Sequence, residues 1–270
     1  RPPRGPAPPP LLIILASIFA GMLAGLLYAA IPALLQIYLG AYEVVTTLLL
    51  NFVAVQFTEW LVLGPLKPAE VTGTTATENF AKELWLPRIL TPSQANVGLF
   101  IALFVAALLF FVMLQTVFGH EVKVVGENAR FAKYSGVNVV RITLLTMLIS
   151  GAVAGLAGTV EVLGSLHRLP AGFNQDMGFN GIVVSLLAQN NPLGCILASF
   201  FFAALKNGAS NMERISNVPA AVSDIVQAFV ILTVTVRIVV PKLKGVFARR
   251  QILRRALTEK DQDNKSGEAV

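Results

Sequence analysis

The side chains best placed to do chemistry are amides and one carboxylate that interrupt long apolar segments. Asn51 lies near the middle of the apolar segment 44–63, and Gln56 follows about one and a half helical turns later. Glu161 lies toward one end of the apolar segment 142–166. An amide that faces hydrocarbon loses its hydrogen bonds, so Asn51 should face other helices. There it would either bond to a neighbouring helix or line the path of a polar ligand. Glu161 would either line such a path or reach the aqueous boundary.

The sequence lacks the patterns that support catalysis or nucleotide binding. It contains no GxxxxGK[ST] motif, which excludes ATP binding through a P-loop, and no HExxH motif, paired carboxylates or Ser-His-Asp arrangement. Cys195 is the only cysteine, so an internal disulfide and a cysteine-based metal cluster are excluded. His120 and His167 lie in different polar segments, without partners at ligand spacing. We therefore expect neither an enzyme nor a chain that binds a metal or cofactor itself.

The composition places these side chains in a membrane. Of the 270 residues, 55% are hydrophobic and 13% are charged, against about 25% charged residues in an average globular protein. A soluble protein this apolar could not cover its surface. A spanning helix needs about 20 mostly apolar residues. The segments that qualify are residues 11–31, with an end near Pro32, 44–63, 97–118, 142–166 and 220–240.

A further segment, "GFNGIVVSLLAQNNPLGCILASFFFAALKNG" (178–208), holds two apolar stretches that Asn190-Asn191-Pro192 separates. Such a pair is typical of re-entrant or discontinuous helices, which need protein or a water-filled cavity around their loose backbone. Asn180 and Gln189 are therefore further candidates for a ligand path. The predicted fold class is all-α, a polytopic transmembrane helix bundle with one discontinuous or re-entrant helix pair.

Small residues recur at helical spacing in the segment "ISGAVAGLAG" (149–158). Gly151, Gly155 and Gly158 would let another helix backbone approach closely in lipid. The sequence therefore predicts helix packing there.

Basic residues predict the orientation of the chain. Segment 119–141 contains four Lys and Arg residues and segment 241–270 contains eight, whereas the loop 64–96 is balanced by acidic residues. The positive-inside rule places 119–141 and 241–270 in the cytoplasm. This distribution also accounts for the net charge of +6 without nucleic-acid binding.

Successive spans cross the membrane in opposite directions. If 119–141 is cytoplasmic, the first span must therefore begin outside the cell, and no signal peptide precedes it. We therefore expect an N-terminally truncated transmembrane domain over residues 1–240 and a basic, disordered tail over 241–270.

The cytoplasmic segment contains a short predicted helix. Asn128 is a good N-cap and Gly136 a good C′ residue, and together they bracket about two helical turns. Arg130 and Lys133 share one face, and Phe131 and Tyr134 share a neighbouring one. The helix would either rest on the bilayer surface or dock into a cytoplasmic partner.

Four blocks resemble a known family. They are "YEVVTTLLLNFVA" (42–54), "VVGENARFAKYSGVNVVR" (124–141), "ISGAVAGLAGTVEVLG" (149–164) and the 178–208 segment quoted above. In this order they are similar to the permease subunits of bacterial ABC importers for nucleosides and simple sugars, within the branched-chain amino-acid and ribose permease group. The chain departs from the family pattern at Ala129, where a proline is usual.

The resemblance implies an ATP-driven importer subunit in the bacterial plasma membrane that forms the translocation path for a nucleoside or simple sugar. It implies a cytoplasmic ABC ATPase that carries ATP and Mg²⁺, a second permease subunit and an extracytoplasmic substrate-binding lipoprotein as partners. An ion-coupled secondary transporter or channel without an ATPase is the alternative. In this family the cytoplasmic loop carries a helix that couples to the ATPase. The matching residues are Gly126, Glu127, Asn128, Ala129, Arg130, Phe131, Ala132, Lys133, Tyr134, Ser135 and Gly136.

Overall fold

The apolar segments form long helices in the computed structural model, which describes residues 9–67, 75–89, 95–173 and 177–216, and also 225, 228 and 229. The helices are α1 (Pro10–Leu39), α2 (Glu43–Leu63), η1 (Lys82–Leu84), α3 (Gly98–Gln115), α4 (Val117–Glu127), α5 (Ala129–Tyr134), α6 (Val139–Glu161), the π-helical turn η2 (Val162–Leu166), α7 (Met177–Leu187) and α8 (Pro192–Ser216). Contacts divide the chain into two units, Arg1–Gly178 and Phe179–Val270.

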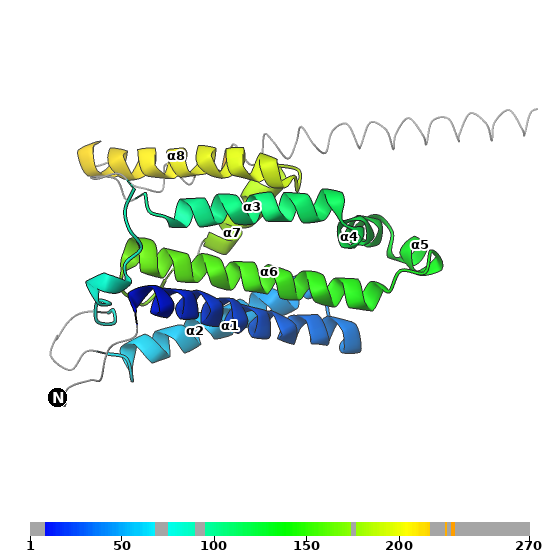
Figure 1. The fold of residues 1–270 in the computed structure, drawn as a ribbon, viewed down its shortest axis with the longest axis horizontal. Coiled ribbons are helices and arrows are strands. Elements are labelled where there is room, and N and C mark those ends of the chain that lie inside the picture. Colours follow the sequence, from blue (N-terminus) through cyan, green and yellow to red (C-terminus); the bar gives the residue numbers. More distant parts are fainter. Residues whose placement is uncertain are drawn as a thin grey trace, which may run out of the picture. The chain divides into compact units, whose positions relative to one another are not determined.

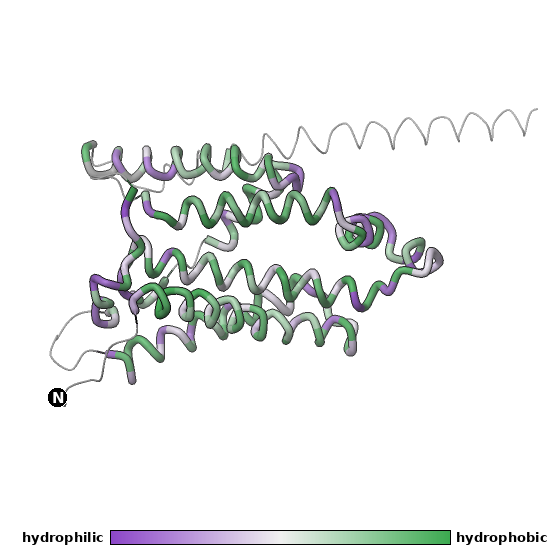
Figure 2. The backbone as a smooth tube through the Cα atoms, in the orientation of Figure 1, coloured by the Kyte–Doolittle hydropathy of each residue, from purple (hydrophilic) through white to green (hydrophobic). Residues whose placement is uncertain are grey.

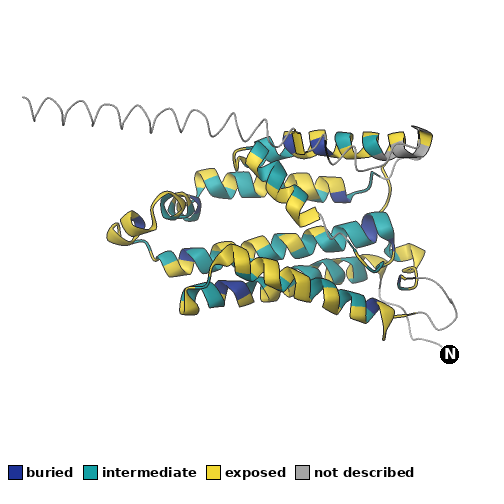
Figure 3. Ribbon diagram, turned by 180° about the vertical axis from the view of Figure 1, so that it is seen from behind, coloured by how far each residue is buried: buried dark blue, intermediate teal, exposed yellow. Residues whose placement is uncertain are grey.

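Within the described residues, five helices are long and apolar enough to cross a membrane. They are α1, α2, α3, α6 together with η2, and the Pro192–Ala209 part of α8. In the most apolar 18-residue stretch of each of these helices, at most 11% of the residues are buried. Most helix surfaces are exposed or partly exposed (Figure 3). Leu and Phe side chains exposed in such numbers belong in hydrocarbon, not in water. The protein is thus a polytopic all-α membrane protein, as the composition predicted.

The first span is longer than predicted. The sequence suggested an end near Pro32, but α1 continues through this buried proline to Leu39, and Gly40 closes it with a left-handed φ of 63°. Proline has no N–H, so the carbonyl of Tyr28 loses its usual helical partner. Transmembrane helices tolerate this loss because neighbouring helices and side chains can satisfy the freed carbonyl.

The third span ends earlier than predicted, and the segment predicted to be cytoplasmic holds two helices instead of one. Thr116 has extended backbone angles and separates α3 from α4. Its hydroxyl accepts a hydrogen bond from the Gly119 N–H at 3.2 Å, which caps α4. Gly126 and Glu127, predicted as part of the coupling helix, instead form the end of α4.

In the first unit, α1 and α6 run antiparallel along each other, and α2 returns beside α1 after a short turn (Figure 1). The turns and short helices lie at the two ends of this group, where many of the residues are hydrophilic (Figure 2). One end carries α4 and α5.

The other end of the first unit carries the segment 75–89, which covers the end of α6. The Phe80 N–H donates to the His167 carbonyl at 2.9 Å, and the Thr77 N–H donates to the Leu169 carbonyl at 3.0 Å. The Trp85 ring lies flat on the buried His167 ring, with centroids 3.8 Å apart. These contacts fix the segment against η2.

The second unit contains the break that the sequence predicted between residues 178 and 208. Gln189 and Asn190 both adopt left-handed backbone angles, with φ of 53° and 58°, and so separate α7 from α8. With 11 residues α7 is too short to span, whereas α8 is long enough. The predicted span 220–240 and the tail 241–270 lie almost entirely outside the described residues.

Candidate functional site

Glycines bring the α1 and α6 backbones into direct contact. A side chain added at Gly25 would collide with the Gly151 carbonyl, and one at Gly155 would collide with the Gly21 carbonyl. A side chain at Gly151 would collide with Ala29. The two helices therefore pack with almost no space for side chains between them.

This contact involves two of the three glycines predicted to pack, and two that were not predicted. Gly158 has nothing within 4 Å of an added Cβ, so it lies away from the contact. Gly21 and Gly25 were missed, although the GxxxG in "GMLAG" (21–25) is the same signal that singled out Gly151 and Gly155.

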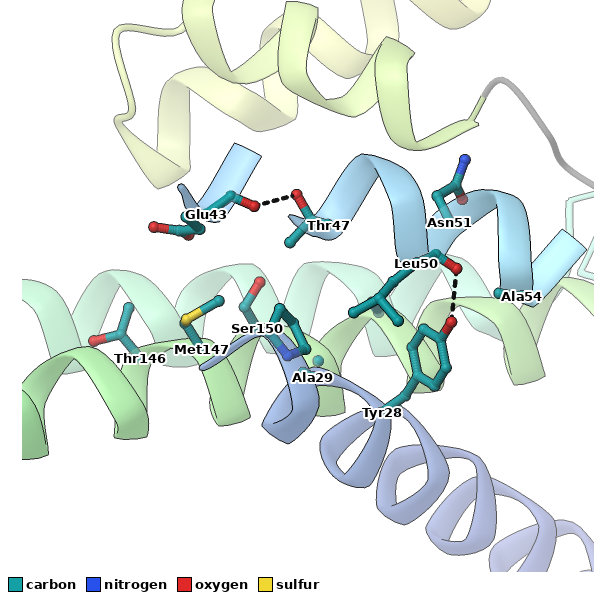
Figure 4. Close-up of a pocket in the computed structure, with 14 residues that line it drawn as sticks. Tyr28, Ala29, Glu43, Thr47, Leu50, Asn51, Ala54, Thr146, Met147 and Ser150 are labelled. Carbon is teal, nitrogen blue, oxygen red and sulfur yellow. Dashed lines mark hydrogen bonds between the residues drawn. The ribbon is translucent and has the colours of Figure 1, made fainter. Parts of the chain in front are cut away.

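Beside this contact, α1, α2 and α6 line an open pocket of about 530 Å³ at the end nearer α5, which we call the inner pocket (Figure 4). Its lining residues are Gly25, Tyr28, Ala29, Pro32, Glu43, Thr47, Leu50, Asn51, Ala54, Thr146, Met147, Ser150, Gly151 and Ala154. The volume lies within the usual range for small-molecule sites.

Most of the polar groups in the inner pocket are uncharged. The hydroxyls of Thr47 and Thr146 donate to carbonyls of their own helices, at 2.9 and 2.8 Å. The Asn51 amide and the Ser150 hydroxyl are exposed and have no hydrogen-bond partner among the described residues. Glu43 is the one carboxylate, and the pocket lining contains no basic residue. Ser150 thus offers an unused hydroxyl to an uncharged polar ligand, and Asn51 offers an unused amide at the edge of the pocket, on the side of α2 away from Tyr28.

Glu43 lies at the mouth of the inner pocket, where α2 begins. The Gln36 side-chain amide donates to the Glu43 carboxylate at 3.3 Å, which joins the end of α1 to the start of α2. The carboxylate is therefore already engaged at the edge of the pocket.

Tyr28 connects α1 to α2 across the inner pocket. Its hydroxyl donates to the Leu50 carbonyl at 2.6 Å, and the two residues face each other in Figure 4. Sequence reasoning missed Tyr28, because a single tyrosine in an apolar helix carries no signal of its partner.

The predicted path residues are distributed over both units. Asn51 lines the inner pocket, on the side of α2 away from Tyr28 (Figure 4). Gln56 and Glu161 lie outside the lining of this pocket. Asn180 in α7 and Gln189 after it belong to the second unit.

The predicted cytoplasmic helix is present as α5, and its ends are well defined. The Asn128 side chain accepts hydrogen bonds from the Arg130 and Phe131 N–H groups at 3.0 and 3.1 Å. At the other end the Gly136 N–H donates to the Lys133 carbonyl, and the Val137 N–H donates to the Ala132 carbonyl. Gly136 has a φ of 82°, so this pattern is a Schellman motif.

The outer surface of α5 is exposed. Phe131 is 61% exposed and Tyr134 is 92% exposed, and Arg130 and Lys133 are also exposed. Only Ala132 is fully buried, where α5 contacts the rest of the unit. The helix is thus a short, capped projection directly before α6.

The sequence identifies the family. Residues 6–235 match the profile of the branched-chain amino acid transport system / permease component family, and the chain belongs to this family.

Curated relatives are ABC transporter permeases. The chain is 35% identical to the guanosine ABC transporter permease protein NupP of Bacillus subtilis, over 82% of this chain and 65% of NupP. It is 34% identical to the glucose ABC transporter permease protein TsgB13 of Haloferax volcanii, over 83% of this chain and 61% of TsgB13. It is 29% identical to the nucleoside ABC transporter permease protein NupB of Lactococcus lactis, over 89% of this chain and 69% of NupB. The chain thus spans about two thirds of the length of these relatives. No solved structure matches it.

Proposed function

We propose that this chain is a membrane-spanning subunit of an ATP-driven ABC importer and that the inner pocket forms part of the path of an uncharged polar solute. A nucleoside is the first candidate and a simple sugar the second. Family membership and the names of NupP, NupB and TsgB13 support the importer class. The observation that carries the substrate class is that the few polar groups in the mainly apolar lining of the inner pocket are mostly uncharged, with no basic residue among them.

The pocket chemistry favours a nucleoside or sugar over an amino acid. An amino acid carries an ammonium and a carboxylate, and each needs a charged or strongly polar partner when water is excluded. No basic residue lines the pocket, and Glu43 is held at its mouth by Gln36. The Asn51 amide and the Ser150 hydroxyl instead match the hydroxyl and carbonyl groups of sugars and bases.

The proposed role of α5 is to transmit force from a separate ABC ATPase, which would bind ATP and Mg²⁺. Its caps make it a short rigid helix, and its aromatic and basic side chains are exposed for contact with a partner. Only Ser135 to Asn138 separate α5 from α6, so movement of α5 would shift α6 directly.

The proposed orientation places the α5 end in the cytoplasm of a bacterial cell. Lys123, Arg130, Lys133 and Arg141 all belong to this end. The opposite end mixes both charges, with Lys82, Glu83 and Arg88 on one loop. The complete importer would contain a second permease subunit and an extracytoplasmic substrate-binding lipoprotein. Asn51 is the first candidate for substrate contact, followed by Gln56, Glu161, Asn180 and Gln189.

The coupling proposal is tested with a matched pair of tyrosines in the complete transporter. Tyr134→Ala in α5 should lower ATP-dependent uptake at least tenfold and weaken co-purification of the ATPase, because an exposed aromatic contact is lost. Tyr134 is 92% exposed, so insertion should be unchanged. Tyr42→Ala is the control, because Tyr42 is 84% exposed at the same end of the first unit. Uptake and ATPase association should both survive Tyr42→Ala.

Two results contradict the proposal. Equal loss in both variants would show that the α5 side chain has no special role. Uptake that continues after the ATPase is removed would instead favour an ion-coupled transporter or channel.

A further inference from the structure

A second pocket lies along the same three helices, beyond the inner pocket. This outer pocket has a volume of about 870 Å³ and is lined mainly by apolar side chains of α1, α2, α6, η1 and the following turns. Phe57, Phe80 and Phe173 supply aromatic rings to it. It lies at the end of the unit away from α5, under the covering segment 75–89.

Three residues line both pockets, namely Gly25, Tyr28 and Ala54. Gly25 and Ala54 have little or no side chain, so Tyr28 is the only large group at the boundary. Tyr28 remains 37% exposed, which fits a ring with open space on both sides. The two pockets therefore adjoin each other along α1, α2 and α6, and Tyr28 lies at their boundary.

The local structure holds Tyr28 in this position and also allows it to move. Its hydroxyl is attached to α2 through the Leu50 carbonyl at 2.6 Å. On its own helix, the Tyr28 carbonyl receives no N–H from Pro32, four residues later. Bending is easiest at a turn that lacks a helical hydrogen bond. The ring at this boundary thus sits on the weakest turn of α1 and is held by one bond to α2.

We propose that Tyr28 is a gate between the outer and inner pockets and that its hydrogen bond to Leu50 keeps the gate closed. The proposal rests on the proposed importer function, because it assigns the two pockets to the path of the transported solute. The outer pocket would hold the flat apolar face of a base or sugar against its phenyl rings. The inner pocket would bind the hydroxyl and carbonyl groups through Asn51 and Ser150 once the ring has moved.

The test measures access to single cysteines in the complete transporter, in membrane vesicles of both orientations. Cys195→Ser removes the only native cysteine. Thr47→Cys then reports on the inner pocket and Val53→Cys on the outer one. The probe is a membrane-impermeant thiosulfonate, applied to one face at a time. With Tyr28 present, each cysteine should react from one face only, and the two faces should be opposite.

Opening the gate should change one of these rates. Tyr28→Ala should raise the labelling rate of Thr47→Cys at least tenfold when the probe is applied to the membrane face from which Val53→Cys reacts. Tyr28→Phe keeps the ring and loses the hydrogen bond, so it should raise that rate two- to fivefold. Phe57→Ala is the matched control, because it removes an aromatic ring from the outer pocket only and should leave that rate unchanged. An unchanged Val53→Cys rate verifies folding of each variant.

The proposal is overturned if Tyr28→Ala and Tyr28→Phe leave the Thr47→Cys rate unchanged, or if Phe57→Ala raises it equally. Labelling requires neither ATP nor transport, so this result is separate from the importer test. Uptake without the ATPase would refute the importer function and leave the labelling result standing. If the Thr47→Cys labelling rate stays low in every Tyr28 variant, the gate is refuted and the importer function still stands.

Discussion

The two neighbours of α1 are attached to it in different ways. Along α6 the backbones touch, because Gly21 and Gly25 face Gly151 and Gly155. Along α2 the helices are separated by pockets and are joined by side chains, chiefly through the Tyr28 hydroxyl. A glycine contact has a single close-packed arrangement, whereas a contact through one side-chain hydrogen bond can open and close.

This difference suggests that the two boundaries of α1 have different roles within the first unit. The α1–α6 pair would move as one body, and α5 is attached to its end through a short turn. The α1–α2 boundary would then be the place where such a movement opens or closes a space. Substitutions that affect one boundary and spare the other test this division.

The largest effect is expected at the glycine contact. Gly155→Ala should lower the free energy of unfolding by about 1–3 kcal/mol, because the new methyl group collides with the Gly21 carbonyl. Heat or denaturant unfolding in detergent, compared with the parent, measures the change.

Gly158→Ala is the control for this prediction, one turn further along the same helix. Nothing lies within 4 Å of its added methyl group, and alanine favours the helix by about 0.5–1 kcal/mol over glycine. A gain at Gly158 with a loss at Gly155 is the expected pattern. Equal changes at both positions would mean that α1 and α6 are not in backbone contact.

A smaller effect is expected at the α1–α2 boundary. Tyr28→Phe should cost about 0.6 kcal/mol, the average for a hydrogen bond between membrane helices, because the Leu50 carbonyl loses this donor. The same unfolding measurement applies, with Tyr38→Phe as the matched variant. Tyr38 is 81% exposed on α1, so loss of its hydroxyl should be neutral. A cost above that of Gly155→Ala would reverse the ranking of the two boundaries.

The smallest effect is expected from a large side chain placed beside the pockets. Ala54→Leu should change stability by no more than about 0.5 kcal/mol, because Ala54 borders open space on both sides of Tyr28. The same side chain should slow labelling of Thr47→Cys in the Tyr28→Ala background by narrowing the route. Destabilisation as large as that of Gly155→Ala would show that α1 and α2 are as closely packed as α1 and α6.

The sequence predicted the features that depend on local pattern. Apolar length predicted α1, α2, α3 and α6, and the Asn128 and Gly136 caps predicted α5, because both signals lie within a few turns of chain. The end near Pro32 was predicted wrongly, because α1 continues through this proline, as membrane helices can when the surrounding protein tolerates the missing hydrogen bond.

The site depends on helix pairing, which the sequence does not specify. Asn51 was predicted as a path residue because its amide stands out in an apolar segment, and it does line the inner pocket. Its role in transport remains a prediction. Tyr28 was not predicted, because its importance follows from Leu50 and from two pockets that exist only once α1, α2 and α6 are assembled.

The glycine contact also sets an order of events during synthesis. About 125 residues separate Gly25 from Gly151, and ribosomes add about 5–20 residues per second. The α1 helix must therefore remain in the bilayer for on the order of ten seconds before α6 has been made. During this interval its bare glycine face is open to any small-residue helix nearby, so biogenesis factors that shield α1 would raise the yield of correctly paired protein.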